Sequence, residues 1–149
     1  MREPEYYWDE ETGVAGCILT DSNDKTYTGT AFCAEEDQDM KSEKTGCTIA
    51  AYRAEIDYYK SMRDNEIKPG LKALRQLYYS INTSKNFDEK SYYARMLKRQ
   101  IRQYETDLAV VNDLLASTKQ DLKTFLTDKE KAYSSFRRMR KNKAQADNN

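Results

Sequence analysis

Histidine is absent from this chain of 149 residues, and glycine, proline and cysteine are scarce, with five, two and three residues. Without histidine the chain lacks the usual general base near neutral pH and the commonest metal ligand in proteins. The cysteines, Cys17, Cys33 and Cys47, are an odd number without a close pair, which favours a reducing compartment over a disulfide scaffold. We therefore expect packing cysteines, no bound metal or cofactor, and no enzymatic activity.

Long apolar runs are also missing. No stretch reaches membrane-spanning length, and the N-terminus lacks the charged-then-apolar opening of a signal peptide. The sequence also lacks a glycine-rich phosphate loop and a paired metal-ligand spacing. We expect a soluble, intracellular protein with no membrane partner.

A net charge of zero conceals an uneven distribution. Residues 1–43 hold twelve acidic and three basic side chains, and residues 44–149 hold thirteen acidic and twenty-two basic ones. Such asymmetry is typical of a surface that binds a nucleic acid or a charged partner. The alternative is that the two parts neutralise each other within one folded unit or across a dimer.

An unbroken 4-3 spacing of mostly apolar residues runs from Ala94 to Met139 and predicts a long coiled-coil helix. The segment contains no glycine or proline and is rich in strong helix formers. We place this helix at about 88–141, capped by Asn86 or Asp88, and expect a frayed tail over 142–149.

An earlier helix is predicted over about 45–81, capped by Ser42 or Thr45. Its apolar positions shift phase by one residue around Pro69, which predicts a kink or short break near Lys68. A short turn over 82–87 then folds the two helices back antiparallel.

The N-terminal part reads as a β-hairpin. Residues 14–20 and 25–33 are the two strands and 21–24 the turn, with Gly16 and Gly29 marking bulges or a close approach of another backbone. The first helix offers the sheet a small-residue face at Gly46, Ala50 and Ala54. The fold class is mainly α (α+β): an acidic β-hairpin head over 1–44 packed on a kinked helix, and a helical hairpin over 45–141.

The second helix is longer than the first, so its last third outruns the partner helix. Its seam continues there through Phe125, Phe136 and Met139. Either the N-terminal hairpin or another subunit has to cover these residues, and we expect a homodimer or higher oligomer.

Aromatic and basic residues gather where the helical hairpin turns. Arginine and tyrosine are the usual chemistry of binding hot spots, and they also suit phosphates and bases. The alternative is a solvated helix face. The residues predicted to contact a partner are Arg75, Tyr79, Tyr92, Arg95, Arg99 and Arg102.

Two weaker clusters precede the first helix or lie on it. The carboxylates Glu35, Glu36, Asp37 and Asp39 could bind a divalent cation, but without an ordered-loop spacing and a suitable glycine they are better explained as a solvated connection. The small residues around Gly29 and Ala50 could make room for a ligand, and Arg53 would then contact its anionic group. Alternatively, they allow a strand to pack on a helix, and Arg53 then pairs with the acidic part.

The stretch Gly29-Thr30-Ala31-Phe32-Cys33, followed by Asp37 and then by Gly46, Ile49-Ala50 and Arg53-Ala54, resembles a family of small proteins from tailed phages and prophages of Gram-positive bacteria. The family pattern is G-x-A-x-C, an acidic turn, and G-x-x-I/L-A-x-x-R-A, and it covers about residues 27–56. Glu35 replaces the usual proline, and Ala34 replaces a frequent histidine. Any metal or catalytic use of that histidine is therefore lost here.

The resemblance implies phage origin and action in the host cytoplasm, but no reaction. Together with the charge pattern it favours a non-enzymatic phage accessory protein that binds a host protein or ribonucleoprotein, for instance a counter-defence inhibitor of the anti-CRISPR kind. Alternatives are a nucleic-acid-binding protein and a coiled-coil virion or scaffold component.

Overall fold

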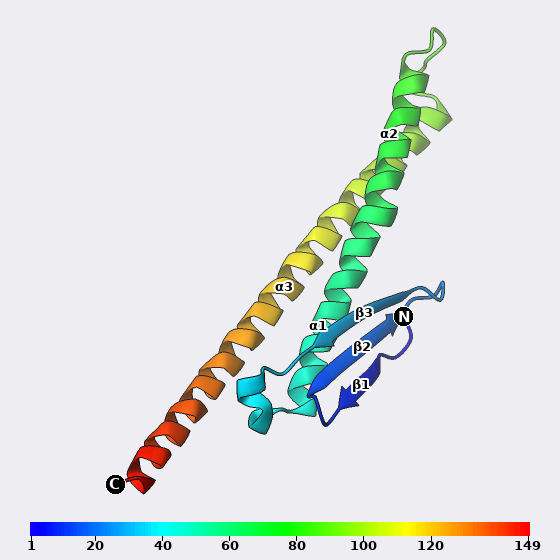
Figure 1. The fold of residues 1–149 in the computed structure, drawn as a ribbon. Helices are drawn as coiled ribbons and strands as arrows, with labels where there is room; N and C mark the ends of the chain where they lie inside the picture. Colours follow the sequence, from blue (N-terminus) through cyan, green and yellow to red (C-terminus); the bar gives the residue numbers. More distant parts are fainter. The chain divides into compact units, whose positions relative to one another are not determined.

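The computed structural model describes all 149 residues and confirms the predicted class, a mainly helical α+β protein (Figure 1). Three strands come first, followed by a 3-10 helix, η1. A π-helical turn, η2, separates the first two α-helices. The elements are β1 (Glu5–Asp9), β2 (Val14–Thr20), β3 (Thr26–Ala31), η1 (Glu35–Met40), α1 (Glu43–Ser61), η2 (Met62–Ile67), α2 (Lys68–Asn82) and α3 (Tyr92–Asp147).

The chain forms two compact units. Unit 1 comprises residues 1–57 and 117–149, and unit 2 comprises residues 58–116. The predicted boundary between head and helical hairpin was residue 44. The first turns of α1 instead belong with the sheet in unit 1, because they carry the small residues on which the sheet packs.

The sheet has three antiparallel strands in the order β1-β2-β3, whereas the sequence predicted a two-stranded hairpin (Figure 1). The predicted turn over 21–24 is present, and the Asp21 carboxylate accepts hydrogen bonds from the backbone N–H groups of Asn23 and Lys25 at 2.8 and 3.0 Å. The prediction missed β1 because Tyr6 and Tyr7 are both exposed. No alternation of apolar and polar residues marks that strand.

Gly29 allows the sheet to approach α1 at backbone distance. A Cβ built on Gly29 would lie 2.0 Å from the carbonyl oxygen of Ala50, and Ala50 and Ala54 are fully buried. The predicted close approach is thus confirmed. The predicted bulges are absent, because β2 and β3 keep a continuous register through Gly16 and Gly29.

Side chains of α1 cover the outer edge of β3. The Arg53 guanidinium donates to the carbonyl oxygen of Thr30, and the backbone N–H of Thr28 donates to the Asp57 carboxylate at 3.3 Å. An uncovered edge strand is a template for pairing with another chain. α1 therefore blocks this edge, and Arg53 binds the sheet backbone instead of the acidic segment.

α1 begins two residues before the predicted start. The Ser42 hydroxyl accepts a hydrogen bond from the backbone N–H of Thr45 at 3.3 Å, so Ser42 is the N-cap, one of the two predicted candidates. At the other end of the chain α3 continues to Asp147, so the predicted frayed tail is mostly helical.

The inward face of α3 in unit 1 departs from the predicted seam after Lys129. Phe136 and Met139, predicted to lie on the seam, are 44% and 67% exposed. A straight α-helix drifts by about 20° per heptad against a 3.5-residue repeat, and over several heptads the drift amounts to a whole position. The half-buried positions of α3 here include Leu122, Phe125, Lys129, Tyr133 and Arg137.

Phe125 is covered within unit 1, which corrects the prediction that the first helix is too short to reach it. Its ring centroid lies 6.2 Å from that of Tyr52 on α1. Only Phe136 and Met139 of the predicted oligomer seam remain exposed, and self-association through them stays a prediction.

The predicted irregularity near Lys68 is the π-helical turn η2, directly before it. A π turn contains one more residue than an α turn and therefore shifts the helical phase by one position, as the sequence pattern required. Pro69 directly follows this turn, as the second residue of α2, and cannot donate a backbone hydrogen bond to the preceding turn.

In unit 2, α2 and the first part of α3 run antiparallel, as predicted. Gly70 faces the ring of Tyr104, and Arg75 donates to Glu105 at 3.0 Å. α3 begins at Tyr92 instead of about residue 88. Its N-cap is Ser91, whose hydroxyl accepts from the backbone N–H of Ala94 at 3.2 Å, and not Asn86 or Asp88.

Candidate functional site

The six residues predicted to contact a partner all belong to unit 2, and all six are exposed. We call them the tip surface: Arg75, Tyr79, Tyr92, Arg95, Arg99 and Arg102. Tyr79 and Tyr92 are 69% and 70% exposed, and the rings of Tyr92 and Tyr93 form an edge-to-face pair with centroids 5.8 Å apart. Large exposed rings of this kind are available as contact area for a partner.

Positive charge dominates the tip surface. Residues 68–102 hold nine basic and only two acidic side chains. Arg75 is paired with Glu105, whereas Arg95, Arg99 and Arg102 make no side-chain hydrogen bond or ion pair. These three arginines recur at spacing i, i+4, i+7, so α3 presents them as one row.

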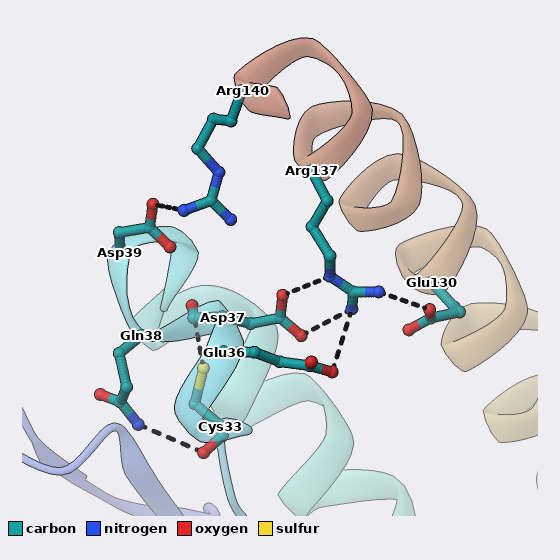
Figure 2. Close-up of polar contacts among 8 residues, drawn as sticks. All are labelled: Cys33, Glu36, Asp37, Gln38, Asp39, Glu130, Arg137 and Arg140. Atoms are coloured by element: carbon teal, nitrogen blue, oxygen red, sulfur yellow. Dashed lines mark hydrogen bonds and ion pairs between the residues drawn. The ribbon is translucent and has the colours of Figure 1, made fainter. Parts of the chain in front are cut away.

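A second polar cluster in unit 1 joins η1 to α3 (Figure 2). The Arg137 guanidinium donates to both carboxylate oxygens of Asp37, at 2.9 and 2.8 Å, and to Glu130 at 3.3 Å. Arg140 makes a further ion pair with Asp39. The bidentate geometry is the strongest form of arginine–carboxylate contact.

Arg137 controls the ionisation of its buried partner. Hydrogen bonds from the guanidinium, with its positive charge, hold the pKa of Asp37 below its ordinary value, against the opposing effect of burial. The pKa of Arg137 is raised in turn, chiefly by its hydrogen bonds to Asp37. Asp37 is therefore ionised at neutral pH and committed to Arg137.

The acidic segment thus binds arginines. The sequence offered a divalent cation or a solvated connection for these residues. Three of its four carboxylates instead pair with α3, and no group of three or more cysteine, aspartate or glutamate residues is placed to hold a metal ion. Neutralisation of the acidic part within one folded unit, an alternative left open by the sequence, occurs at Glu36, Asp37 and Asp39.

A cavity of about 180 Å³ lies beside this cluster in unit 1, bounded by the sheet, η1, α1 and α3. Its polar lining includes Cys33, Asp37, Lys41 and Tyr133. The Cys33 thiol donates to the backbone carbonyl of Asp37 at 3.3 Å, and burial raises its pKa, with the Asp37 charge as a further cause. Burial likewise raises the pKa of Tyr133. Both groups stay protonated at neutral pH, so neither is an activated nucleophile or base.

The small-residue face leaves no room for a ligand. Backbone atoms of α1 already fill the space over Gly29, and Ala31 and Ala50 are buried. Burial also raises the pKa of Cys17 and Cys47, and all three cysteines are free thiols, which agrees with a packing role. The packing alternative for this face is therefore the one that the structure supports.

Sequence reasoning missed the partners of the acidic segment. Arg137 and Arg140 are one helical turn apart, and Asp37 and Asp39 are two residues apart, so two cations on one helix face were available for two nearby carboxylates. That spacing was a signal for the pairing. The separation of 100 residues between Asp37 and Arg137 hides it from local pattern analysis.

Comparison with protein-family models, curated proteins and solved structures found no match to this chain. No helix combines the length and apolar character needed to cross a membrane.

Proposed function

We propose that this chain is a non-enzymatic binding protein that holds another macromolecule on the tip surface of unit 2. The observation that carries the proposal is that large exposed tyrosine rings lie among arginines without a partner in the chain. Tyrosine and arginine are enriched in binding hot spots because each combines a large contact area with a polar end. A soluble chain with no partner would gain nothing from these exposed rings.

The resemblance to phage and prophage proteins supplies the most concrete form of the proposal. In this form the chain is a phage accessory protein that binds a host protein or ribonucleoprotein and blocks it, as a counter-defence inhibitor of the anti-CRISPR kind does. This form rests on the resemblance of residues 27–56 alone.

A second candidate function is a structural role in a larger assembly. Phe136 and Met139 on α3 are exposed apolar residues at 44% and 67%. A coiled-coil virion or scaffold component would use such residues for contacts between copies.

Affinity purification from bacterial lysate, with and without nuclease, tests the main proposal. The variant Arg95→Glu/Arg99→Glu reverses two exposed charges of the tip surface. Its matched control, Lys119→Glu/Lys123→Glu, reverses two exposed charges at the same i, i+4 spacing on α3 in unit 1. We expect the parent chain and the control to retain one dominant partner and the tip variant to lose it.

Circular dichroism and melting of both variants should stay near the parent, because exposed helix positions contribute little to stability. Equal retention of the partner by the tip variant and the control would contradict the proposal. Recovery of the chain in purified virus particles would favour the structural role instead.

A further inference from the structure

A groove runs along one flank of unit 2 and includes Arg75 and Tyr79 of the tip surface. Leu71 and Leu108 lie in it, and Lys68, Lys72 and Arg75 line it from α2. These basic residues recur at spacing i, i+4, i+7, and Tyr79, also in the groove, follows at i+11. α2 therefore presents them as one row, about 16 Å long at 1.5 Å per residue.

Two cations of α3 lie on the same side. Arg75 donates to Glu105 at 3.0 Å, which identifies the flank of α3 that borders the groove. Lys98 and Arg102 precede Glu105 by seven and three residues, so they share that flank. The Lys98 ammonium lies 5.8 Å from the ring centroid of Tyr78, which confirms that this part of α3 faces α2.

The groove has no negative charge of its own. No carboxylate lines it, and α2 contains no acidic residue from Lys68 to Asn82. Beside the groove, Glu105 pairs with Arg75 and Asp64 pairs with Lys68, whereas Lys72 and Arg102 make no side-chain hydrogen bond or ion pair. Lys72 and Arg102 are therefore the cations of this flank that are complementary to a negatively charged chain.

We infer that this groove binds single-stranded nucleic acid, with phosphates on Lys72 and Arg102 and a base stacked on the ring of Tyr79. The inference rests on the proposed function and names the class of partner, either free or as the nucleic-acid part of a ribonucleoprotein. Basic residues that follow a backbone, together with an exposed aromatic ring, are the recurring chemistry of single-strand binding. An acidic protein segment offers the cations similar charges but brings no planar bases for Tyr79.

Fluorescence anisotropy with a labelled oligothymidylate tests the inference over a series of salt concentrations. A mixed-sequence duplex is the second probe. Each phosphate contact contributes about 0.7 to the slope of log affinity against log salt for a single strand, so Lys72→Gln/Arg102→Gln should flatten the slope by about 1.4. The control Lys119→Gln/Lys123→Gln removes two exposed cations from α3 in unit 1 and should leave the slope unchanged.

Tyr79→Leu keeps an apolar side chain but removes the ring. We expect it to weaken binding of the oligothymidylate about tenfold or more and to affect the duplex little, because stacking on an aromatic ring requires an unpaired base. Circular dichroism confirms that each variant is folded.

Three results would overturn the inference: no binding of the oligothymidylate at low salt, the same slope for the groove variant and the control, or equal binding of strand and duplex with no effect of Tyr79→Leu. Failure of the proposed function is distinguishable from these results. If a protein is captured from nuclease-treated extract and lost in the Arg95→Glu/Arg99→Glu variant, the tip surface binds a protein and only the nucleic-acid inference fails.

Discussion

Gly29→Ala is the sharpest test of the packing between the sheet and α1. The added Cβ would lie 2.0 Å from the carbonyl oxygen of Ala50 and 2.4 Å from the backbone nitrogen of Ala54. Real Cβ atoms essentially never come within 3.0 Å of such atoms, so strand and helix must separate by about 1.0 Å, the difference between 3.0 and 2.0 Å. Backbone on both sides leaves no flexible side chain to yield. A separation of that size forfeits a quarter to a half of the dispersion energy at each contact.

We expect Gly29→Ala to lower the free energy of unfolding of unit 1 by about 3 kcal/mol, in the upper part of the range for overpacked cores. For a unit of this size the melting temperature should fall by roughly 12 to 24 °C. Trp8, the only tryptophan, lies in β1 and contacts Gly46 on α1, so its fluorescence reports the unfolding of unit 1.

Gly16→Ala is the matched control for this substitution. It adds the same methyl group to the same sheet, but its Cβ would lie 3.7 Å from Tyr7 and 4.0 Å from the carbonyl oxygen of Gly29, both ordinary contact distances. It should be neutral or stabilise the fold by up to about 1 kcal/mol through the loss of glycine freedom in the unfolded chain. Similar melting of the two variants would refute the described contact of β3 with α1.

Three further predictions concern unit 1. The pKa of Asp37 is lowered in the folded chain, so its stabilising contribution is complete above the unfolded carboxyl pKa of about 3.9 and is lost as the pH falls through the lower folded value. The variant Asp37→Asn should therefore be less stable than the parent near neutral pH and should lose less stability on acidification. Equal acid sensitivity of variant and parent, measured by Trp8 fluorescence, would count against the Arg137 contact. Phe136→Glu should dissociate the predicted dimer or higher oligomer without loss of helix, and a parent chain that is monomeric by light scattering at micromolar concentration would disprove self-association. Because burial raises the pKa of Cys33, its thiol should react slowly with a disulfide reagent at neutral pH, and the folded Cys33→Ser variant should retain partner binding. Bound zinc by elemental analysis, or loss of binding in the folded variant, would overturn the packing role of Cys33.

Local rules predicted the features that depend on neighbours in the chain. Ser42 was recognisable as a helix cap because a hydroxyl before a helix satisfies a free N–H group. The phase shift before Pro69 predicted the position of the π turn, and the run of small residues on α1 predicted the close approach of Gly29.

Features that depend on distant partners were not predictable in this way. β1 shows no period because Tyr6 and Tyr7 face solvent, and only its pairing with β2 makes it a strand. The charge pattern indicated that the acidic and basic parts attract each other, but it did not indicate that Arg137 forms an ion pair with Asp37. The seam of α3 was misplaced at Phe136 because a small drift per turn becomes visible only over a long helix.

Two unmatched cations of unit 2, Lys72 and Arg102, support a binding role for this unit because they lie near the exposed ring of Tyr79. In unit 1, Arg137 and Arg140 are each matched by a carboxylate of η1. In unit 2, Lys68 and Arg75 are matched by Asp64 and Glu105, whereas Lys72 and Arg102 have no carboxylate partner. Folding therefore gains nothing from Lys72 or Arg102, whereas a polyanionic partner would supply the missing negative charge. Unit 1 also has unmatched cations, among them Lys119 and Lys123, so a partner is indicated by the groove and the exposed Tyr79 ring beside Lys72, and not by unmatched charge alone.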